Sequence, residues 1–485
     1  MRDRSNDDGR TAGGREKQDR GLMMGLVHCF TEEDSIGNSD ATDLAYRIRA
    51  KEVSIEEVFA DTVTRIEKVE PIIKAVQCAD YVTPESSGDV SAPFHGIPTF
   101  VKDNTMLRGF PVRMGSKATR SDTATESDEY GSAFSGMGFT LLGKSKLPEL
   151  AGQPTTEYEV GDPTVNPWNT GHSAGGSSGG AAALVASGAV TVAHANDGGG
   201  SIRMPAAWNG LVGMKWSPGR HITGIPRNPA VPDFVSQGVL SRSVRDQEKY
   251  MIAMDAQSPR GARSGPVSSG RYSGSKYRVG IISQAYFDID AEVAAAVTDI
   301  GGRLASRGLP VAGTALPYGA EFIEAFYLFY GYATAGLVGL FGLDPAALEV
   351  FTREIMLNST SKPDATEESL AKMRAFGKDV YSKYFSDFDV IITPVAPHAA
   401  PELGYLGPLP DFETSSERWR KSIVFGAQCN IAEAPAISVP VGLSTTGLPI
   451  GVQILGKPGD DAVVLDLAYL VEEAAEFSQL AYIGA

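Results

Sequence analysis

The chain has 485 residues, of which 42% are hydrophobic and 21% are charged, and its formal net charge is −16. This length and composition are typical of a globular protein with a large core, and they exclude a fibrous or wholly disordered chain. The acidity, without any block of Lys and Arg, argues against a nucleic-acid binder. Three cysteines without metal-ligand spacing predict neither a zinc site nor a disulfide framework, so a cytoplasmic setting is expected.

Residues 1–38 have the character of a tail in front of one domain that spans residues 39–485. The opening residues MRDRSNDDGRTAGGREKQDR are charged and glycine-rich, without a hydrophobic period, which is typical of disorder. The apolar segment GLMMGLVHCF that follows is too short for a signal peptide. Within the domain, the small polar residues at 256–275 predict a surface loop. We therefore expect a disordered tail and a single folded unit.

Hydrophobic periodicity predicts alternating helices and strands along this domain. Helices are expected at 40–50 and 54–69, the second opened by a capping box of Ser54 and Glu57. Strands are expected at 97–101, 139–142, 189–194, 277–282, 389–393, 436–441 and 451–455, and helices at 180–188, 290–306 and 460–475. This alternation predicts an α/β fold with helices on the faces of a sheet.

The uncharged run AFYLFYGYATAGLVGLFGL at residues 325–343 is close to the roughly 20 residues that a membrane-spanning helix needs. It is rich in Gly and Tyr, and acidic residues flank it on both sides without a positive flank to orient it. We therefore expect a buried helix that lines a pocket, and no membrane span. Such a pocket favours an apolar part of a ligand.

Serines lie in two glycine-dense turns between residues 171 and 220. The first turn, Gly171-His172-Ser173-Ala174-Gly175, matches the G-x-S-x-G elbow that holds a nucleophilic serine in α/β-hydrolases. The matching HGGG-type oxyanion motif is missing upstream, and the histidines available as a base are His194, His221 and His398. We therefore disfavour Ser173 as a nucleophile and interpret His172 as pocket rim or scaffold.

The second turn, DGGGSIR at residues 197–203, offers Ser201 as the alternative nucleophile. Glycines permit a tight turn in which the amides of Gly198, Gly199, Gly200 and Ser201 converge on the carbonyl oxygen under attack. A close-packed structural turn is the other reading, and a phosphate cradle is disfavoured because no GK[ST] follows. A buried lysine with a lowered pKa can replace histidine as the base. Lys102, directly after the strand at 97–101, is the candidate.

These segments together resemble the amidase signature family over nearly the whole chain. The resemblance is carried by GGSSGGAAALVASGAVTVAHANDGGGSIRMPAAWNGLVGMKWSPGR, HGIPTFVKD, TLLGKSKLPEL, DVIITPVAP and GLPIGVQILGKPGDD. The Ala-Asn-Asp that precedes three glycines is similar to the branch that contains 6-aminohexanoate-cyclic-dimer hydrolases. The resemblance implies the amidase signature fold, in which a central mixed β-sheet is covered by helices on both faces.

The resemblance also implies a Ser-cisSer-Lys triad. Ser201 would form the acyl-enzyme, Ser177 would pass the proton, and Lys102 would be the base. Ser177 would follow a cis peptide bond. Further residues implied are Ser178 as a hydrogen-bonding support, Asp197 with Arg203 as an ion pair that braces the glycine loop, and Thr155, Gly176, Phe326 and Tyr330 as substrate-binding residues. Lys146 and Glu433, where this chain departs from the common pattern, would border the acyl pocket.

The function implied is hydrolysis of a carboxamide to a carboxylate and an amine or ammonia, on a small aryl or aliphatic amide. Two alternatives stay open: a carbamate or ester hydrolase on the same triad, and the A subunit of a tRNA-dependent amidotransferase. No metal or organic cofactor is expected, since side chains supply both nucleophile and base. The expected partner is a small-molecule amide, and assembly into a homodimer is left open.

Overall fold

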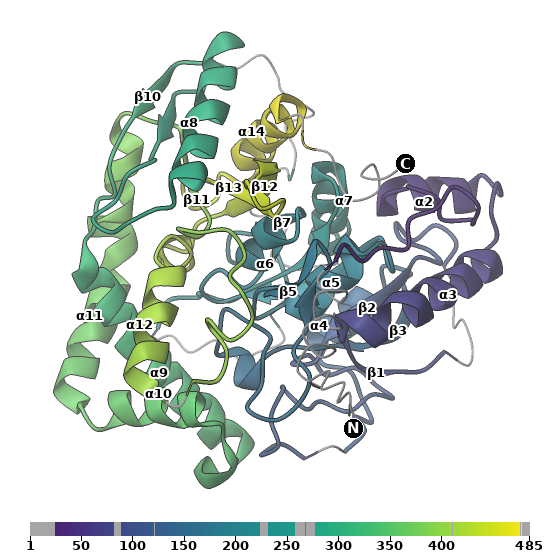
Figure 1. Cartoon of the computed structure of the whole chain (residues 1–485), viewed down its shortest axis with the longest axis horizontal. Helices are drawn as coiled ribbons and strands as arrows, with labels where there is room; N and C mark the ends of the chain where they lie inside the picture. The colour runs from purple at the N-terminus through teal and green to yellow at the C-terminus, as the bar shows by residue number, and fades with distance from the viewer. Residues whose placement is uncertain are drawn as a thin grey trace, which may run out of the picture.

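The computed structural model describes residues 25–81, 89–120, 122–223, 231–257, 267, 277–409, 411–475 and 477. Its centre is a mixed sheet of eight strands in the order β10-β9-β11-β13-β12-β7-β8-β6 (Figure 1). β9 is parallel to β10 and β11, and the pairs from β11 to β6 are antiparallel. In sheet order the strands are Val311–Gly313, Val279–Ile281, Val390–Pro394, Pro449–Leu455, Ala436–Leu443, Val212–Lys215, Ser236–Ser241 and Val192–Asp197. The predicted mixed sheet is confirmed.

A second sheet of three strands adjoins the β6 edge of the central one. It has the order β1-β3-β2 and comprises Val76–Ala79, Thr140–Ser145 and Pro98–Lys102. β2 contacts β6 through Thr99, whose Oγ1 donates to the Val192 carbonyl at 2.8 Å. This contact brings the end of β2 beside the end of β6, where the glycine loop begins. A two-stranded sheet, β4 (Val165–Asn166) and β5 (Asn169–Ser173), completes the set among the described residues.

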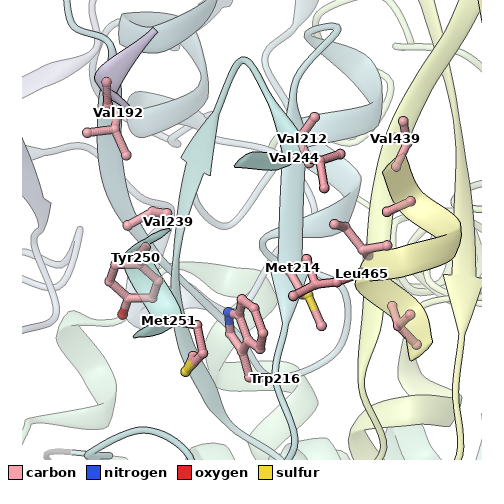
Figure 2. Close-up of a cluster of buried hydrophobic side chains, with 14 of the residues drawn as sticks. Val192, Val212, Met214, Trp216, Val239, Val244, Tyr250, Met251, Val439 and Leu465 are labelled. Atoms are coloured by element: carbon pink, nitrogen blue, oxygen red, sulfur yellow. The ribbon is translucent and has the colours of Figure 1, made fainter. Parts of the chain in front are cut away.

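One face of the central sheet carries the first core cluster. Every second strand residue points to it, as at Ile437 and Val439 of β12. Figure 2 shows part of this cluster, in which Trp216, Met251 and Leu465 lie among strand valines. The helices on this face are α2 (Ala41–Arg49), α4 (Glu129–Ser135), α7 (Val244–Asp255), α8 (Ala291–Ser306) and α14 (Asp461–Ala474).

The opposite face is covered by the remaining α-helices. Ile391 and Leu455, which alternate with the residues of the first cluster, pack here against aromatic side chains. Figure 1 shows α9 to α12 gathered on one side of the molecule and α3 on the other. The helices are α3 (Ile55–Ile73), α5 (Gly179–Ala186), α6 (Arg203–Trp208), α9 (Ala320–Phe341), α10 (Val350–Thr360), α11 (Pro363–Asp379), α12 (Phe412–Ser422) and α13 (Ala427–Ile431).

α9 contains the apolar run singled out in the sequence. Among the described helices it is the one long and apolar enough to cross a membrane by length and composition. Its residues Phe322, Phe326 and Phe329 are buried in the second core cluster. The helix is therefore part of the core on that face, as expected for a pocket-lining helix.

The predicted elements with strong local signals are present. α3 begins at the capping box, in which the Glu57 amide donates to Ser54 Oγ and the Ser54 amide donates to Glu57 Oε2. β12 and β13 form the expected antiparallel pair. β6 lies three residues further along than expected, because residues 187–191 form the turn after α5.

The predicted disorder through residue 38 is wrong for residues 25–38. Cys29 and Ile36 are buried in the core, and Asp34 pairs with the buried guanidinium of Arg65 on α3 at 2.6 Å. This pairing could not be predicted from the sequence, because no local pattern identifies Arg65 as the partner of Asp34. Residues 1–24, and all of the expected loop at 256–275 except 256, 257 and 267, lie outside the described residues.

Candidate active site

The Lys102 side chain lies at the end of β2, fully buried between the two sheets. Its backbone amide donates to Nδ1 of His194 at 3.1 Å, and Nε2 of His194 contacts Gln237 Oε1 at 3.0 Å. Burial lowers the pKa of His194 to about 3, so the imidazole is neutral and its Nδ1 can accept. His194 therefore fixes the backbone of Lys102 and is no base for Ser173.

Three side-chain oxygen atoms lie close to the Lys102 amine, and the Asn196 carbonyl is farther away at 3.5 Å. Nζ lies 2.8 Å from Ser177 Oγ, 2.9 Å from Ser178 Oγ and 2.8 Å from Asn196 Oδ1. A neutral amine has two N–H donors and one lone pair. Asn196 Oδ1 can only accept, and the Ser178 hydroxyl donates to the Asn196 carbonyl at 3.4 Å, so both oxygens take N–H donors. The lone pair of the amine is then left for the hydroxyl of Ser177.

Burial lowers the pKa of the Lys102 amine to about 7, although the Asp197 carboxylate opposes this shift. About half of the amines are therefore neutral at pH 7. A neutral amine in contact with a serine hydroxyl can act as a general base. Ser177 itself is 1% exposed, and the peptide bond between Gly176 and Ser177 is cis.

The glycine loop after β6 is held by a buried ion pair. Arg203 Nη2 and Nε each lie 2.9 Å from the Asp197 carboxylate, and both side chains are fully buried. Burial alone would raise the pKa of Asp197, but Arg203 and the Asn430 amide hold it well below its usual range. Arg203 also donates to Gln453 and to the Gly426 carbonyl. The ion pair thus connects the loop to the central sheet and to the segment before α13.

The loop presents fewer donors than the sequence predicted. The amide of Gly200 donates to Asp197 Oδ1 at 2.7 Å, so the expectation that it faces an oxyanion is wrong in this conformation. The amides of Gly198, Gly199 and Ser201 donate to no other described residue. These three are the donors that an oxyanion could use.

Ser201 is half-buried and lines a narrow cavity of about 20 Å³ together with Gly176. Phe326 and Tyr330 of α9 and Trp419 of α12 form an aromatic wall of this cavity. Ser201 Oγ makes no hydrogen bond to any described residue, Ser177 included. Gly176, the residue before Ser177, lines this cavity with Ser201, but the two serine hydroxyls lack the direct hydrogen bond that a proton relay requires.

Thr155 does not line the cavity, contrary to expectation. Its hydroxyl is fully buried between Glu157 Oε1 at 2.6 Å and Ser173 Oγ at 2.8 Å. Ser173 also accepts from the Gly175 amide at 3.0 Å. Because Ser173 is buried in this network, and His194 is engaged elsewhere, the elbow motif here is structural. His172 is half-buried, and its backbone forms an isolated antiparallel β-bridge with that of Glu402, which fits a scaffold role.

The two departures from the common family pattern also lie away from the cavity beside Ser201. Lys146 Nζ is 6.0 Å from the centre of the Tyr158 ring and 3.5 Å from the Asp162 carbonyl. Glu433 borders a larger cavity of about 950 Å³, which Tyr381 and Lys457 also line. None of the predicted triad, oxyanion or substrate-binding residues lines that larger cavity. Size alone therefore does not locate the site in this chain.

Several residues of the site were not predicted. Asn196 had a local signal, because it lies inside the glycine-rich motif and departs from the common residue there. Trp419 and Gln153 had none, since α12 and the segment before Thr155 reach the site only through the tertiary fold. No group of His, Cys, Asp and Glu among the described residues is arranged to hold a metal ion.

Comparisons with known proteins agree on one family. A family model described as Amidase matches residues 65–465. AmiC of Mycobacterium tuberculosis is 33% identical over 479 residues, which cover 94% of this chain and 98% of AmiC. The 6-aminohexanoate-cyclic-dimer hydrolase of Paenarthrobacter ureafaciens is 29% identical over 470 residues, covering 90% of this chain and 94% of the hydrolase.

Solved structures give the same result. A 6-aminohexanoate cyclic dimer hydrolase complexed with substrate has a TM-score of 0.81 at 28% identity, covering 91% of this chain and 99% of that chain. A bacterial aryl acylamidase of the amidase signature family has a TM-score of 0.78 at 25% identity, covering 91% and 97%.

Proposed function

This chain belongs to the amidase signature family, which makes it a hydrolase of linear amides, and we propose that it acts through an acyl-enzyme on Ser201. Ser177 passes the proton of Ser201 to Lys102 in this reaction. The observation that carries the proposal is the Lys102 amine: it is fully buried, has a pKa near 7 and lies 2.8 Å from Ser177 Oγ.

In acylation, Ser201 Oγ forms a bond to the carbonyl carbon of the amide. Its proton moves to Ser177 Oγ while the Ser177 proton moves to Nζ of Lys102. The amides of Gly198, Gly199 and Ser201 stabilise the negative charge on the carbonyl oxygen. The Ser177 hydroxyl must turn toward Ser201 for this step, because the two serines do not touch in the structure.

The tetrahedral intermediate then breaks at its C–N bond. The protonated Lys102 returns the proton through Ser177 to the departing nitrogen, which leaves as a neutral amine or ammonia. Water attacks the acyl-enzyme with the same relay as base, and a carboxylate leaves. Ser178 and Asn196 keep the lone pair of the amine directed at Ser177 in both steps, because they occupy its two donors.

The substrate is an aryl or aliphatic amide with an uncharged portion next to the scissile bond. The aromatic wall of Phe326, Tyr330 and Trp419 supports this, since no charged side chain among the described residues lines the cavity beside Ser201. Carbamate and ester hydrolysis are side activities of the same triad. We also propose a cytoplasmic setting, which the three free thiols support.

The test is labelling with a fluorophosphonate that reacts with activated serines, read by intact-protein mass spectrometry. The wild-type chain and Ser173→Ala should be labelled once, and Ser201→Ala should not be labelled. Labelling of Ser201→Ala, together with its loss in Ser173→Ala, would restore the elbow serine as nucleophile. Rates on anilides, linear amides, cyclic amide oligomers, carbamates and esters then rank the substrate classes.

A further inference from the structure

Gln153 is a largely buried polar side chain beside the proposed nucleophile. It is 5% exposed, yet its carboxamide makes no hydrogen bond to any described residue. A primary carboxamide carries two N–H donors and an acceptor oxygen. Because Gln153 lines two cavities, its donors and its acceptor are available to a ligand that enters them.

Gln153 belongs to the walls of two cavities. The inner one is the cavity at Ser201, and the outer one lies between Gln153 and the side chains of Phe351 and Phe412. The backbone of Gln153 lies against Gly176, where an added Cβ would come within 2.6 Å of the Gln153 carbonyl oxygen. Gln153 thus separates the space beside the nucleophile from the space beyond it.

The other polar side chains of the aromatic wall are already paired. The Tyr330 hydroxyl donates to the Ala151 carbonyl at 3.0 Å, and Trp419 Nε1 donates to the Gly152 carbonyl at 3.0 Å. Apart from Ser201, Gln153 is therefore the side chain of the inner cavity whose hydrogen-bonding capacity is unused. A substrate that passes the aromatic wall meets this one polar group next.

The outer cavity carries carboxylates. Glu159 and Glu349 line it, and each accepts a backbone amide of the other segment, Val350 N at Glu159 and Glu159 N at Glu349. No Lys or Arg of the described part of the chain lines this cavity. Burial and the neighbouring Glu149 raise the pKa of Glu349 to about 7. A carboxylate on the substrate would add another acid to this acidic cluster, which disfavours it.

We propose that Gln153 determines specificity by hydrogen-bonding an uncharged polar group that the substrate carries beyond its scissile amide. This inference rests on the proposed function and specifies its substrate class. The class is neutral amides with an apolar segment that ends in a group such as a second amide. The inner cavity, of about 20 Å³, and the outer one, of about 10 Å³, are narrow, so substrate entry displaces side chains. Because Gln153 lies between the cavities, its movement joins them.

The test uses acyl 4-nitroanilides with chains from butanoyl to octanoyl that end in a methyl group, a primary carboxamide or a carboxylate. Release of 4-nitroaniline gives kcat/KM for each. The wild-type chain should prefer the carboxamide end over the methyl end at one or more lengths, with the carboxylate end poorest. At those lengths Gln153→Met should lower kcat/KM for the carboxamide end by about tenfold and leave the methyl end within about twofold.

Tyr330→Phe is the matched control, because it deletes a polar group of the same cavity that is already paired inside the protein. It should leave the ratio between carboxamide and methyl ends unchanged. Gln153→Asn keeps the amide group and therefore tests whether loss of activity comes from misfolding. Loss of all activity in both Gln153 variants would assign the residue a structural role and overturn the proposal. An unchanged ratio in Gln153→Met at every length would overturn it as well.

Failure of the proposed function has a different signature. If the wild-type chain releases no 4-nitroaniline from any chain length, or if Ser201→Ala releases it equally well, then the amide hydrolysis assigned to Ser201 is wrong. Both signatures appear in the methyl-ended series, whose chain end offers no group for the Gln153 carboxamide to bind.

Discussion

The hydrolysis rate should depend on pH through one group, the Lys102 amine. With its pKa near 7, kcat/KM should rise with pH through an acidic limb centred there, because only the neutral amine accepts a proton. At pH 5 the neutral fraction, and with it the rate, falls to about one-hundredth of the plateau. A neutral 4-nitroanilide does not itself titrate, so the limb reports the free enzyme.

The Asn196→Asp variant tests whether this acidic limb reports the titration of Lys102. Asn196 Oδ1 lies 2.8 Å from Nζ, so the variant places a carboxylate where a neutral oxygen now accepts. An opposite charge this close raises the pKa of the amine by roughly 1–3 units. The acidic limb should move upward by that amount, which lowers kcat/KM at pH 7 by about 5-fold or more and restores it at higher pH.

The assay is kcat/KM from pH 5 to 10 on one acyl 4-nitroanilide for the wild-type chain, Asn196→Asp and Glu472→Gln. Glu472 on α14 is the control, because burial raises its pKa to about 7 as well, and its carboxyl accepts from the Val244 amide of α7. Its variant should leave the limb in place. A flat wild-type profile, or a limb that moves with Glu472 and not with Asn196, would refute a neutral lysine as the base.

Three predictions concern stability. Lys102→Met should abolish hydrolysis. Between pH 7 and the ordinary lysine pKa of 10.5, the unfolding free energy of the wild-type chain should rise by about 1.4 kcal/mol per pH unit relative to this variant, because the unfolded lysine binds a proton that the folded one lacks. Urea unfolding at pH 7 and 9 measures this difference. Asp197→Asn should lower the unfolding free energy by about 3–5 kcal/mol, because it leaves the Arg203 guanidinium buried without its counter-charge. Gly180→Ala should lower the melting temperature, because a Cβ there would lie 2.5 Å from the backbone nitrogen of Lys146 and force the start of α5 away from β3.

Matched variants separate these effects from general sensitivity. Asp389→Asn breaks an ion pair with Arg278 that is partly exposed, so it should cost less than about 1 kcal/mol. Gly302→Ala adds a Cβ with nothing within 4 Å in the middle of α8 and should be neutral or stabilising. The reasoning would be contradicted if Asp197→Asn and Asp389→Asn lost equal unfolding free energy, or if Gly180→Ala and Gly302→Ala had equal melting temperatures. It would also be contradicted if the difference in unfolding free energy between the wild-type chain and Lys102→Met did not change with pH.

The sequence predicted those parts of the fold that depend on neighbouring residues. The capping box at Ser54, the strand that ends at Lys102 and the glycine loop before Ser201 all have their cause within a few positions, and periodicity locates them. The aromatic wall could not be predicted in this way. Trp419 reaches the cavity from α12, and nothing around it in the sequence distinguishes it from a core tryptophan.

Errors arose where a distant partner decides the outcome. The Gly200 amide was expected to be free because its glycine turn is open, but the Asp197 carboxylate captures it at 2.7 Å. Residues 25–38 were expected to belong to a disordered tail, but Arg65 on α3 supplies the partner for Asp34. Both are side-chain contacts that no local pattern contains.

The alternation of strand β6 explains how a carboxylate and a neutral lysine coexist at this site. Successive side chains of a strand point to opposite faces. Asn196 therefore faces Lys102, whereas Asp197, the next residue, faces Arg203 on the other side. A carboxylate at position 196 would pair with the amine and keep it protonated, so the base would be lost at neutral pH. Because the carboxylate lies one position later, at Asp197, it pairs with Arg203 and accepts from the glycine loop. The neutral amide of Asn196 can then orient the Lys102 amine without stabilising its protonated form.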